Sequence, residues 1–549
     1  MSRSLIVRNA RVWTGGAPVP GADCVRVERG RIAAVGAWSA LPPRRPGVEV
    51  LDARGATVTP GLCDAHLHLL AWARSLDELD LHGASSAAAC AAEVAARARA
   101  RPAARAIVGR GWDPHDWPDR PHRALLDAAC PDRPVVLHAH DFHAVWVNGA
   151  ALAAAGVGAR PEDPPGGRFE RDADGAPDGV VREHAVRPFQ ALADALRDAD
   201  DGPALEAAVA RLHAAGVTAV HDFEGRDAFA LLAARAVRRG ARLRVLAQLP
   251  HAALDAALAL GLASGVGDRW LRVGAVKLFA DGTLGSRTAA MLEPYDGAGG
   301  TGMDLLPPEV LAADVRRALE GGLAVAVHAI GDRAVRHVVD AFESAGAALA
   351  RPALPSRVEH VQIAHPADLA RLARLGLVAS MQPSHCASDL PLAERYWGSR
   401  RARCYPWRAV LDLGAALVFG SDAPVEPPDP AAGLHAAVTR QRRDGTPAGG
   451  WVPEQRVSLD AALAAYTEAP ARAAGWWPRV GALRLGADAD LVVWNRDLHA
   501  LPPERLHAAR PVATVIAGEV VWRAEGSSGG TGEGGAPRAR AAGPRREAP

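Results

Sequence analysis

The sequence predicts a (β/α)8 barrel flanked by a small β-sandwich that the two ends of the chain build together. Short apolar runs alternate with alanine-rich segments at helical spacing through the middle of the chain, and both ends have the pattern of short strands separated by glycine turns. Residue types that commonly bind metals, such as histidine and aspartate, recur where the apolar runs end. A hydrophobic content of 49% is enough for a large core, so the 549 residues are expected to be globular.

The composition argues against several classes of protein. The 63 basic and 62 acidic side chains leave a net charge of +1, too little for a protein held to nucleic acid or to a membrane surface by charge. No run approaches the roughly 18 apolar residues of a membrane helix, and Leu5-Ile6-Val7 is too short for a secretion signal. The six cysteines have no CxxC spacing, which argues against a disulfide framework or a thiolate zinc site. We therefore expect a cytoplasmic protein.

The two ends of the chain share a β-like pattern. The expected strands are Leu5–Trp13, Cys24–Val27, Ile32–Val35 and Val48–Leu51 near the start, and Leu491–Trp494, Val512–Ile516 and Val520–Trp522 near the end. Residues 1–58 and 481–523 are expected to form one composite sandwich. Residues 524–549 are dominated by Gly, Ser, Pro, Ala and Arg, which predicts a disordered tail.

Residues 59–480 are expected to form the barrel. Its eight predicted strands are Leu62–Leu69, Val217–Phe223, Leu243–Leu249, Val273–Phe279, Leu323–Ala329, Val358–Val361, Leu377–Gln382 and Ala416–Gly420, and helical segments lie between them. The alternation has one long break, at about 107–201. We expect this segment to be an insertion that follows the first strand and caps the active site.

A single lysine, Lys277, stands out in a chain whose other 62 basic residues are arginines. A composition so biased towards arginine has little reason to keep a lysine unless its chemistry is needed. The alternative is one leftover surface cation. The position of Lys277 on the fourth predicted strand favours the chemical interpretation.

The ends of the predicted strands carry a set of metal-binding side chains, and barrel active sites lie at these ends. His66 and His68 point the same way because residues two apart share one face of a strand. Taken singly, each residue has an ordinary structural explanation, such as a turn for Asp422. Jointly they indicate a metal centre, and the set is His66, His68, Lys277, His328, His360 and Asp422.

The chain resembles the amidohydrolase superfamily, and most closely its YtcJ-like branch, which includes N-substituted formamide deformylases. The resemblance covers about residues 1–523 and rests on five motifs, which are VTPGLCDAHLH at 58–68, KLFADGTLGSR at 277–287, HAIGDRA at 328–334, VEHVQ at 358–362 and GSDAP at 420–424. Two segments of the insertion, 141–148 and 177–183, resemble segments that border the substrate pocket. Phe142 departs from the pattern, because a small residue is common there.

The resemblance implies two divalent ions and a carbamate formed by carbon dioxide on Lys277. In the family pattern His66, His68 and Asp422 hold one ion, His328 and His360 hold the second, and the carbamate and a hydroxide join them. Imidazole and carboxylate ligands suit zinc best, although manganese, nickel and iron accept the same ligands. Asp422 would take the proton from the attacking hydroxide and deliver it to the leaving nitrogen.

The implied function is hydrolysis of a carbon–nitrogen bond in a small non-peptide amide, with an N-substituted formamide as the expected substrate. His143 and Arg287 are candidates for an oxyanion donor, with a structural role as the alternative for each. Trp112, Trp146 and His143 are candidate substrate contacts, although tryptophan packing accounts for the first two equally well. Hydrolysis of a cyclic imide, urea or lactone, deamination of a ring, and a non-catalytic regulatory or binding role on the same fold are the other functions considered. The sequence does not determine the assembly, and a homodimer is the commonest outcome for chains of this kind.

Overall fold

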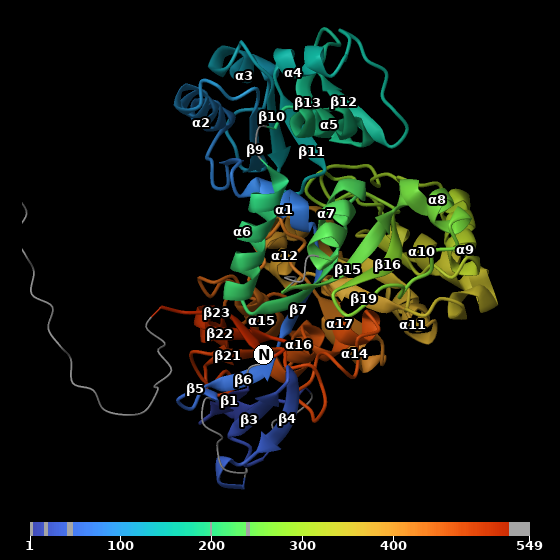
Figure 1. Ribbon diagram of the computed structural model, residues 1–549. Coiled ribbons are helices and arrows are strands. Elements are labelled where there is room, and N and C mark those ends of the chain that lie inside the picture. Colours follow the sequence, from blue (N-terminus) through green and yellow to red (C-terminus); the bar gives the residue numbers. More distant parts are fainter. Residues whose placement is uncertain (1–3, 16–19, 41–47, 198–199, 238–241, 526–549) are drawn as a thin grey trace, which may run out of the picture.

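The computed structural model describes residues 4–15, 20–40, 48–197, 200–237 and 242–525. Three parts follow one another along the molecule, with a cap above the central barrel and a β-sandwich below it (Figure 1). The predicted tail lies outside the described residues from residue 526 onward.

Eight parallel strands form the central sheet, in the order β20-β19-β18-β17-β16-β15-β14-β7. They are β7 (Leu62–Leu67), β14 (Val217–Asp222), β15 (Arg244–Pro250), β16 (Leu271–Phe279), β17 (Val325–Ala329), β18 (Arg357–His360), β19 (Val378–Met381) and β20 (Ala416–Phe419). Each falls on one of the predicted apolar runs, and almost all of their residues are buried, as expected for a parallel sheet covered on both faces. The predicted barrel is confirmed.

The two edges of this sheet meet just beyond the ends of β7 and β20. The amide of Asp422 donates to the carbonyl of His66 at 2.7 Å, and the amide of His68 donates to the carbonyl of Ala423 at 2.8 Å. Gly420 allows this approach, since a Cβ added there would lie 2.4 Å from the backbone nitrogen of His66. The seam of the barrel therefore brings Asp422 beside the two histidines of the first strand.

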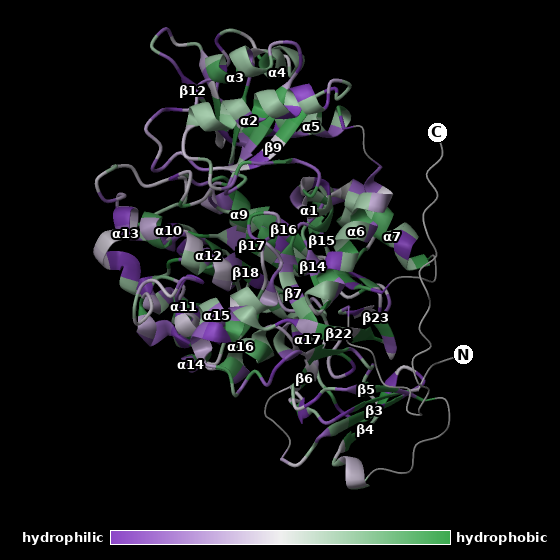
Figure 2. Cartoon of the chain, turned by 90° about the vertical axis from the view of Figure 1, so that its left-hand side faces the viewer, coloured by the Kyte–Doolittle hydropathy of each residue, from purple (hydrophilic) through white to green (hydrophobic). Residues whose placement is uncertain are grey.

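Helices surround the barrel and present both hydrophobic and hydrophilic residues (Figure 2). They include α1 (Leu69–Ser75), α6 (Asp201–Ala214), α7 (Arg226–Val237), α8 (Leu254–Ala259), α9 (Pro308–Glu320), α10 (Asp332–Ala345), α11 (Pro366–Arg374), α12 (Pro383–Ser388), α13 (Leu390–Trp397), α14 (Trp407–Asp412), α15 (Pro430–Thr439), α16 (Leu459–Ala465) and α17 (Glu468–Ala473). In α10 the buried side chains Val335, Val338, Val339 and Phe342 recur at helical spacing and form one face. Within the described residues, no helix combines the length and apolar character needed to cross a membrane.

The cap is built on a six-stranded sheet in the order β12-β13-β11-β10-β9-β8. Its elements are β8 (Leu79–Asp80), α2 (Ala87–Ala100), β9 (Ile107–Trp112), α3 (Arg123–Ala129), β10 (Val135–Ala139), β11 (Ala144–Val147), α4 (Gly149–Ala154), β12 (Gly167–Arg171), β13 (Pro177–Glu183) and α5 (Arg187–Ala195). The predicted start of the insertion, at residue 107, is too late, because β8 and α2 already belong to the cap. The sequence did not reveal this earlier start, because the two residues of β8 are too few to show a strand pattern and the alanine-rich α2 has the composition of a barrel helix.

The sandwich consists of two sheets, in the orders β4-β3-β1-β5 and β2-β6-β21-β22-β23. Their strands are β1 (Leu5–Arg8), β2 (Arg11–Val12), β3 (Cys24–Glu28), β4 (Arg31–Gly36), β5 (Glu49–Asp52), β6 (Thr57–Pro60), β21 (Leu491–Trp494), β22 (Pro511–Ile516) and β23 (Glu519–Arg523). Both sheets contribute to one apolar core, in which Val7 and Val27 lie with Leu491 and Val515. The strand β6 was not predicted, and it pairs with β21 just before the chain enters the barrel at β7.

A buried ion pair joins the barrel to the C-terminal segment. Arg244, on β15, is fully buried and donates to Asp490 at 2.6 Å and to Asp488 at 3.1 Å. Asp488 also pairs with Arg479, whereas Arg244 is the only cation paired with Asp490 among the described residues.

We expect Arg244→Met to lower the free energy of unfolding by about 3 to 5 kcal/mol, because it leaves the buried Asp490 without a cation. Arg242→Met is the matched control, since Arg242 pairs with Glu519 where both side chains are partly exposed, and it should cost about 1 kcal/mol or less. Urea denaturation of the two variants and the wild type gives both values. Equal, small losses would contradict a stabilising role for the buried pair.

Candidate metal centre and active site

A cavity of about 1090 Å³ lies between the cap and the carboxyl ends of the barrel strands. Nine of the residues predicted from the sequence line it, from elements that are far apart in the chain. They are His66, His68, Trp112, His143, Lys277, Arg287, His328, His360 and Asp422. The cavity is therefore the candidate active site, and both the barrel and the cap contribute to it.

His66 lies at the centre of a buried polar network. Its Nδ1 is 2.7 Å from the carboxylate of Glu359, which only accepts hydrogen bonds, so Nδ1 carries the proton. Arg357 donates to the same carboxylate at 2.5 Å and to the hydroxyl of Ser380 at 2.6 Å. Burial lowers the pKa of His66 to about 4, so the ring is neutral. Its Nε2 is buried without a hydrogen-bond partner in the described structure, and its lone pair is available to a metal.

His328 on β17 and His360 on β18 are held in the same way, each by an acceptor at one ring nitrogen. The Nε2 of His328 is 3.1 Å from the carbonyl of Gly282, and the Nδ1 of His360 is 2.8 Å from the side-chain oxygen of Gln382. Both partners are acceptors, so these nitrogens carry the protons. Burial holds the pKa of each ring well below its ordinary value. The remaining nitrogens are lone-pair donors, and the two ring centroids are 4.4 Å apart.

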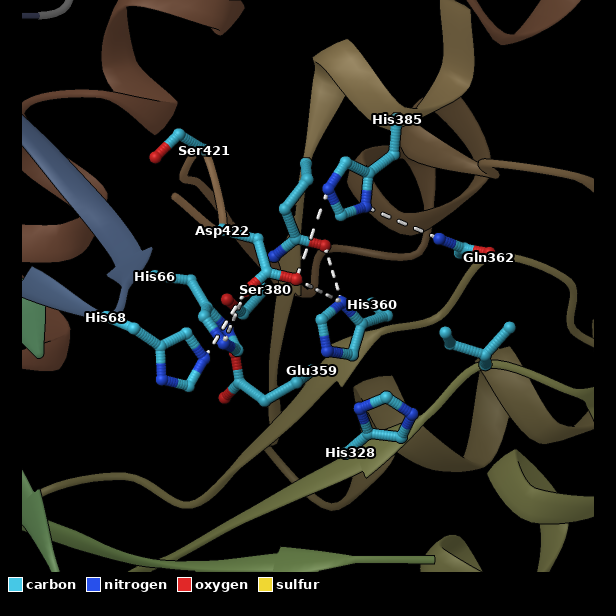
Figure 3. A network of polar contacts seen from close by, with 12 residues as sticks. His66, His68, His328, Glu359, His360, Gln362, Ser380, His385, Ser421 and Asp422 are labelled. Atoms are coloured by element: carbon cyan, nitrogen blue, oxygen red, sulfur yellow. Dashed lines mark hydrogen bonds and ion pairs between the residues drawn. The ribbon is translucent and has the colours of Figure 1, made fainter. Parts of the chain in front are cut away.

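Asp422 joins the histidines of β7 to those of the later strands (Figure 3). Its Oδ1 is 3.5 Å from the Nε2 atoms of both His66 and His68, and its Oδ2 is 3.9 Å from Nδ1 of His360. The candidate ligand atoms of His66, His68 and Asp422 all lie within 4.8 Å of one another. Burial opposes ionisation of this carboxyl group, but the neighbouring imidazoles hold its pKa well below the usual range. The donor set therefore fits a divalent cation.

Lys277 is buried beside this donor set. Its Nζ lies 4.7 Å from the ring centroid of Phe223 and 4.8 Å from that of Phe279. Burial lowers the pKa of the amine to about 8, against the opposing effect of Glu359 and Asp422. A larger fraction of the amine is therefore neutral at physiological pH than for an exposed lysine, as carbamate formation requires.

The cap contributes a second histidine–carboxylate pair. The Nδ1 of His143 lies 2.7 Å from Glu183, and its ring is 5.4 Å from that of His328. Burial disfavours the imidazolium, but the Glu183 carboxylate raises the pKa of His143 to about 9. His143 is therefore a hydrogen-bond donor held over the barrel mouth.

The structure adds residues to which the sequence analysis assigned no role. Glu359 and Gln382 orient the imidazoles described above, and Asp64 accepts from the amides of His66 and Ser421 across the barrel seam. His385, on α12, has its Nε2 4.0 Å from Oδ2 of Asp422. The sequence signals for these residues were their places close to predicted strand ends and, for Asp64 and Glu359, within the motifs at 58–68 and 358–362.

The two tryptophans that were predicted to contact substrate lie in different environments. Trp112 borders the cavity but is only 2% exposed, and its indole donates to the carbonyl of Leu137 at 2.8 Å. Trp146 is fully buried in the core of the cap and does not line the cavity. The prediction that Trp146 contacts the substrate is therefore wrong, because the strand β11 directs this side chain towards Trp112.

Comparisons with known proteins agree with this geometry. Residues 49–522 match the sequence profile of the amidohydrolase family. The chain is 31% identical to YtcJ of Bacillus subtilis over 91% of its own length and 96% of that protein. It is 30% identical to an N-substituted formamide deformylase of Arthrobacter pascens over 96% of its length and 99% of that protein. A crystal structure of an uncharacterized metal-dependent hydrolase from Pyrococcus horikoshii is similar with a TM-score of 0.72 and 27% identity, and covers 91% of this chain and 99% of that one.

We expect Glu359→Gln to weaken metal binding about 10- to 100-fold, because His66 loses the carboxylate that fixes its tautomer and raises its basicity. Competition against a chromogenic zinc chelator measures this affinity. Glu183→Gln is the matched control, since it makes the same change beside His143, which is outside the metal-ligand set. Unchanged zinc affinity in Glu359→Gln would show that this carboxylate does not support the site.

Proposed function

Because the chain belongs to the amidohydrolase family, and is therefore a metal-dependent hydrolase of carbon–nitrogen bonds other than peptide bonds, we propose that it acts on a small amide, with an N-substituted formamide as the best candidate. The observation that carries this proposal is the convergence of five strand ends on one cavity. They bring to it four imidazoles, one carboxylate and the only lysine of the chain. The likeness to a formamide deformylase over nearly the whole chain supports the choice of substrate.

We propose that the donor set holds two divalent ions. His66, His68 and Asp422 would hold one ion, His328 and His360 would hold the second, and a carbamate on Lys277 would join them. Zinc suits these ligands best, and manganese, nickel and iron are the alternatives. Ions bound there supply Lewis acidity, which lowers the pKa of water and polarises a carbonyl group.

Asp422 is the proposed general base and acid. Its carboxylate is ionised, lies at the barrel seam and borders the cavity. It accepts the proton of the attacking water and delivers it to the amide nitrogen, so that the carbon–nitrogen bond breaks with the release of a neutral amine. Oδ1 faces the histidines of the first strand, whereas Oδ2 faces His360 and His385.

His143 is the proposed donor to the carbonyl oxygen of the substrate. Glu183 holds the ring through Nδ1, and this leaves Nε2 as the free donor position. The charge that develops on the oxygen during hydrolysis would strengthen this hydrogen bond. The cap thus supplies electrostatic stabilisation, while the barrel supplies the base and the metal ligands.

Metal-loaded protein should release formate from N-benzylformamide faster than it hydrolyses cyclic imides, ureas, lactones or aryl esters of similar size. Asp422→Asn should lower this turnover about 10²- to 10⁴-fold, because the amide retains the size of the side chain but is no base. Formate release measures both rates, and circular dichroism checks that the variant is folded. Activity within a few-fold of the wild type in Asp422→Asn would assign the proton transfer to another group.

Lys277→Arg should abolish both activity and the binding of close to two metal ions per chain, because arginine stays cationic and forms no carbamate. Lys277→Ala leaves space for a small carboxylate, so formate, acetate or propionate should partly restore its metal content and activity. Elemental analysis after metal loading, with and without added carboxylate, gives the metal content of each variant. A metal-replete, active Lys277→Arg protein would exclude the carbamate.

A further inference from the structure

Arg287 differs from most of the arginines around the cavity because it has no carboxylate partner. Seven arginines line the cavity, and five of them, Arg74, Arg97, Arg101, Arg182 and Arg197, form ion pairs. Among the described residues, Arg287 forms no ion pair, and its guanidinium lies 5.8 Å from the ring centroid of Tyr396. Arg287 is exposed, and a guanidinium on an aromatic face whose donors have no protein partner in the described structure is suited to bind an anion.

The loop that carries Arg287 is held in one conformation by the cap. Arg287 itself has a left-handed backbone with φ of 56°, which is strained for a side chain other than glycine. The hydroxyls of Thr283 and Ser286 donate to Oδ2 of Asp141 at 2.7 and 2.8 Å. The ring of His115, also from the cap, lies 3.0 Å from the carbonyl of Gly285. These contacts from the cap to the residues just before Arg287 hold the strained conformation.

Asp141 links this loop to the proposed carbonyl donor. Its second oxygen, Oδ1, accepts from the amide of His143 at 3.0 Å. One partly buried carboxylate of the cap thus positions both His143 and the segment that presents Arg287. This common support fixes the loop that carries Arg287 relative to the group that would bind the amide carbonyl.

The surroundings of Arg287 indicate the rest of the ligand. The same cavity is lined by apolar side chains, which are Phe142, Phe279, Leu284, Leu305, Ile330 and Tyr396. A molecule that fills this space and pairs with Arg287 would have an apolar body and one carboxylate. The second unpaired arginine, Arg187, lies at the start of α5 and borders an adjoining pocket together with Glu224, which competes with an anionic ligand there.

We propose that Arg287 binds a carboxylate of the substrate, so that the substrate class is an N-formyl or N-acyl derivative of an apolar amino acid. This inference rests on the proposed function. For the formyl case, water adds to the formyl carbon, the carbon–nitrogen bond breaks, and the products are formate and the free amino acid, whose nitrogen takes the proton. Arg287 is then a specificity-determining residue, and its guanidinium forms two hydrogen bonds to the carboxylate.

A pair of substrates isolates this interaction. N-formylphenylalanine and N-(2-phenylethyl)formamide have the same formamide and phenyl groups, and only the first has a carboxylate. We expect the wild type to prefer N-formylphenylalanine. Arg287→Met should raise the KM for this substrate about 10- to 100-fold with little change in kcat, because a charge-assisted pair is lost. Its kcat/KM for the neutral formamide should stay within about two-fold of the wild type.

Two further variants keep the test decisive. Arg187→Met removes the same charge from the start of α5 and should leave the KM for N-formylphenylalanine unchanged. Arg287→Lys keeps the charge but lacks the planar fork, and should restore part of the loss. If Arg287→Met does not fold, Arg287→Lys still tests the pair through the KM difference between the two substrates.

The outcomes separate this inference from the function on which it rests. Equal kcat/KM for both substrates in the wild type, or an equal loss in Arg187→Met, would overturn the role of Arg287 while amide hydrolysis stands. Hydrolysis of neither formamide by metal-replete protein would overturn the proposed function, and the inference with it. A rise in KM that is confined to the carboxylate substrate and to Arg287 would establish the anion site.

Discussion

The buried carboxylate of Glu359 accepts the Nδ1 proton of His66 and is neutralised by Arg357, and the metal centre depends on this contact. An imidazole binds a metal only as a neutral ring with one lone pair free, and burial alone does not choose which nitrogen is free. The acceptor at Nδ1 makes that choice for His66. Gln382 makes it for His360, and the carbonyl of Gly282 makes it for His328.

The barrel brings these groups together through its seam. The backbone hydrogen bonds between the ends of β7 and β20 place Asp422 beside His66 and His68. Its Oδ1 is 3.5 Å from Nε2 of each histidine, and lengthening the Asp422 side chain by one methylene would change these distances. Both Asp422 and His360 have left-handed backbone conformations. Such strain at two candidate ligands is maintained because the packed barrel determines the course of the chain on both sides of each residue.

The cap does more than cover the barrel. The carboxylates of Asp141, which is partly buried, and Glu183, which is buried, accept from hydroxyls on the loop after β16, so the cap and barrel share polar contacts at the cavity itself. The same two carboxylates hold His143 at its amide and its ring. A movement of the cap would therefore displace the proposed carbonyl donor, His143, together with the loop of Arg287.

By itself the sequence determined the barrel, the composite sandwich and the candidate metal-binding side chains. Local patterns were sufficient because alternation identifies each strand and because residues at strand ends share one rim of a barrel. Counting the basic residues was enough to single out Lys277. The tertiary structure decided what no local pattern contains: that Glu359 meets His66 across 293 residues, that Trp146 packs inside the cap, and that the cap begins at β8. Each of these depends on how distant segments pack, and packing sets which side chains meet, which nitrogen keeps its proton and which arginine is left unpaired.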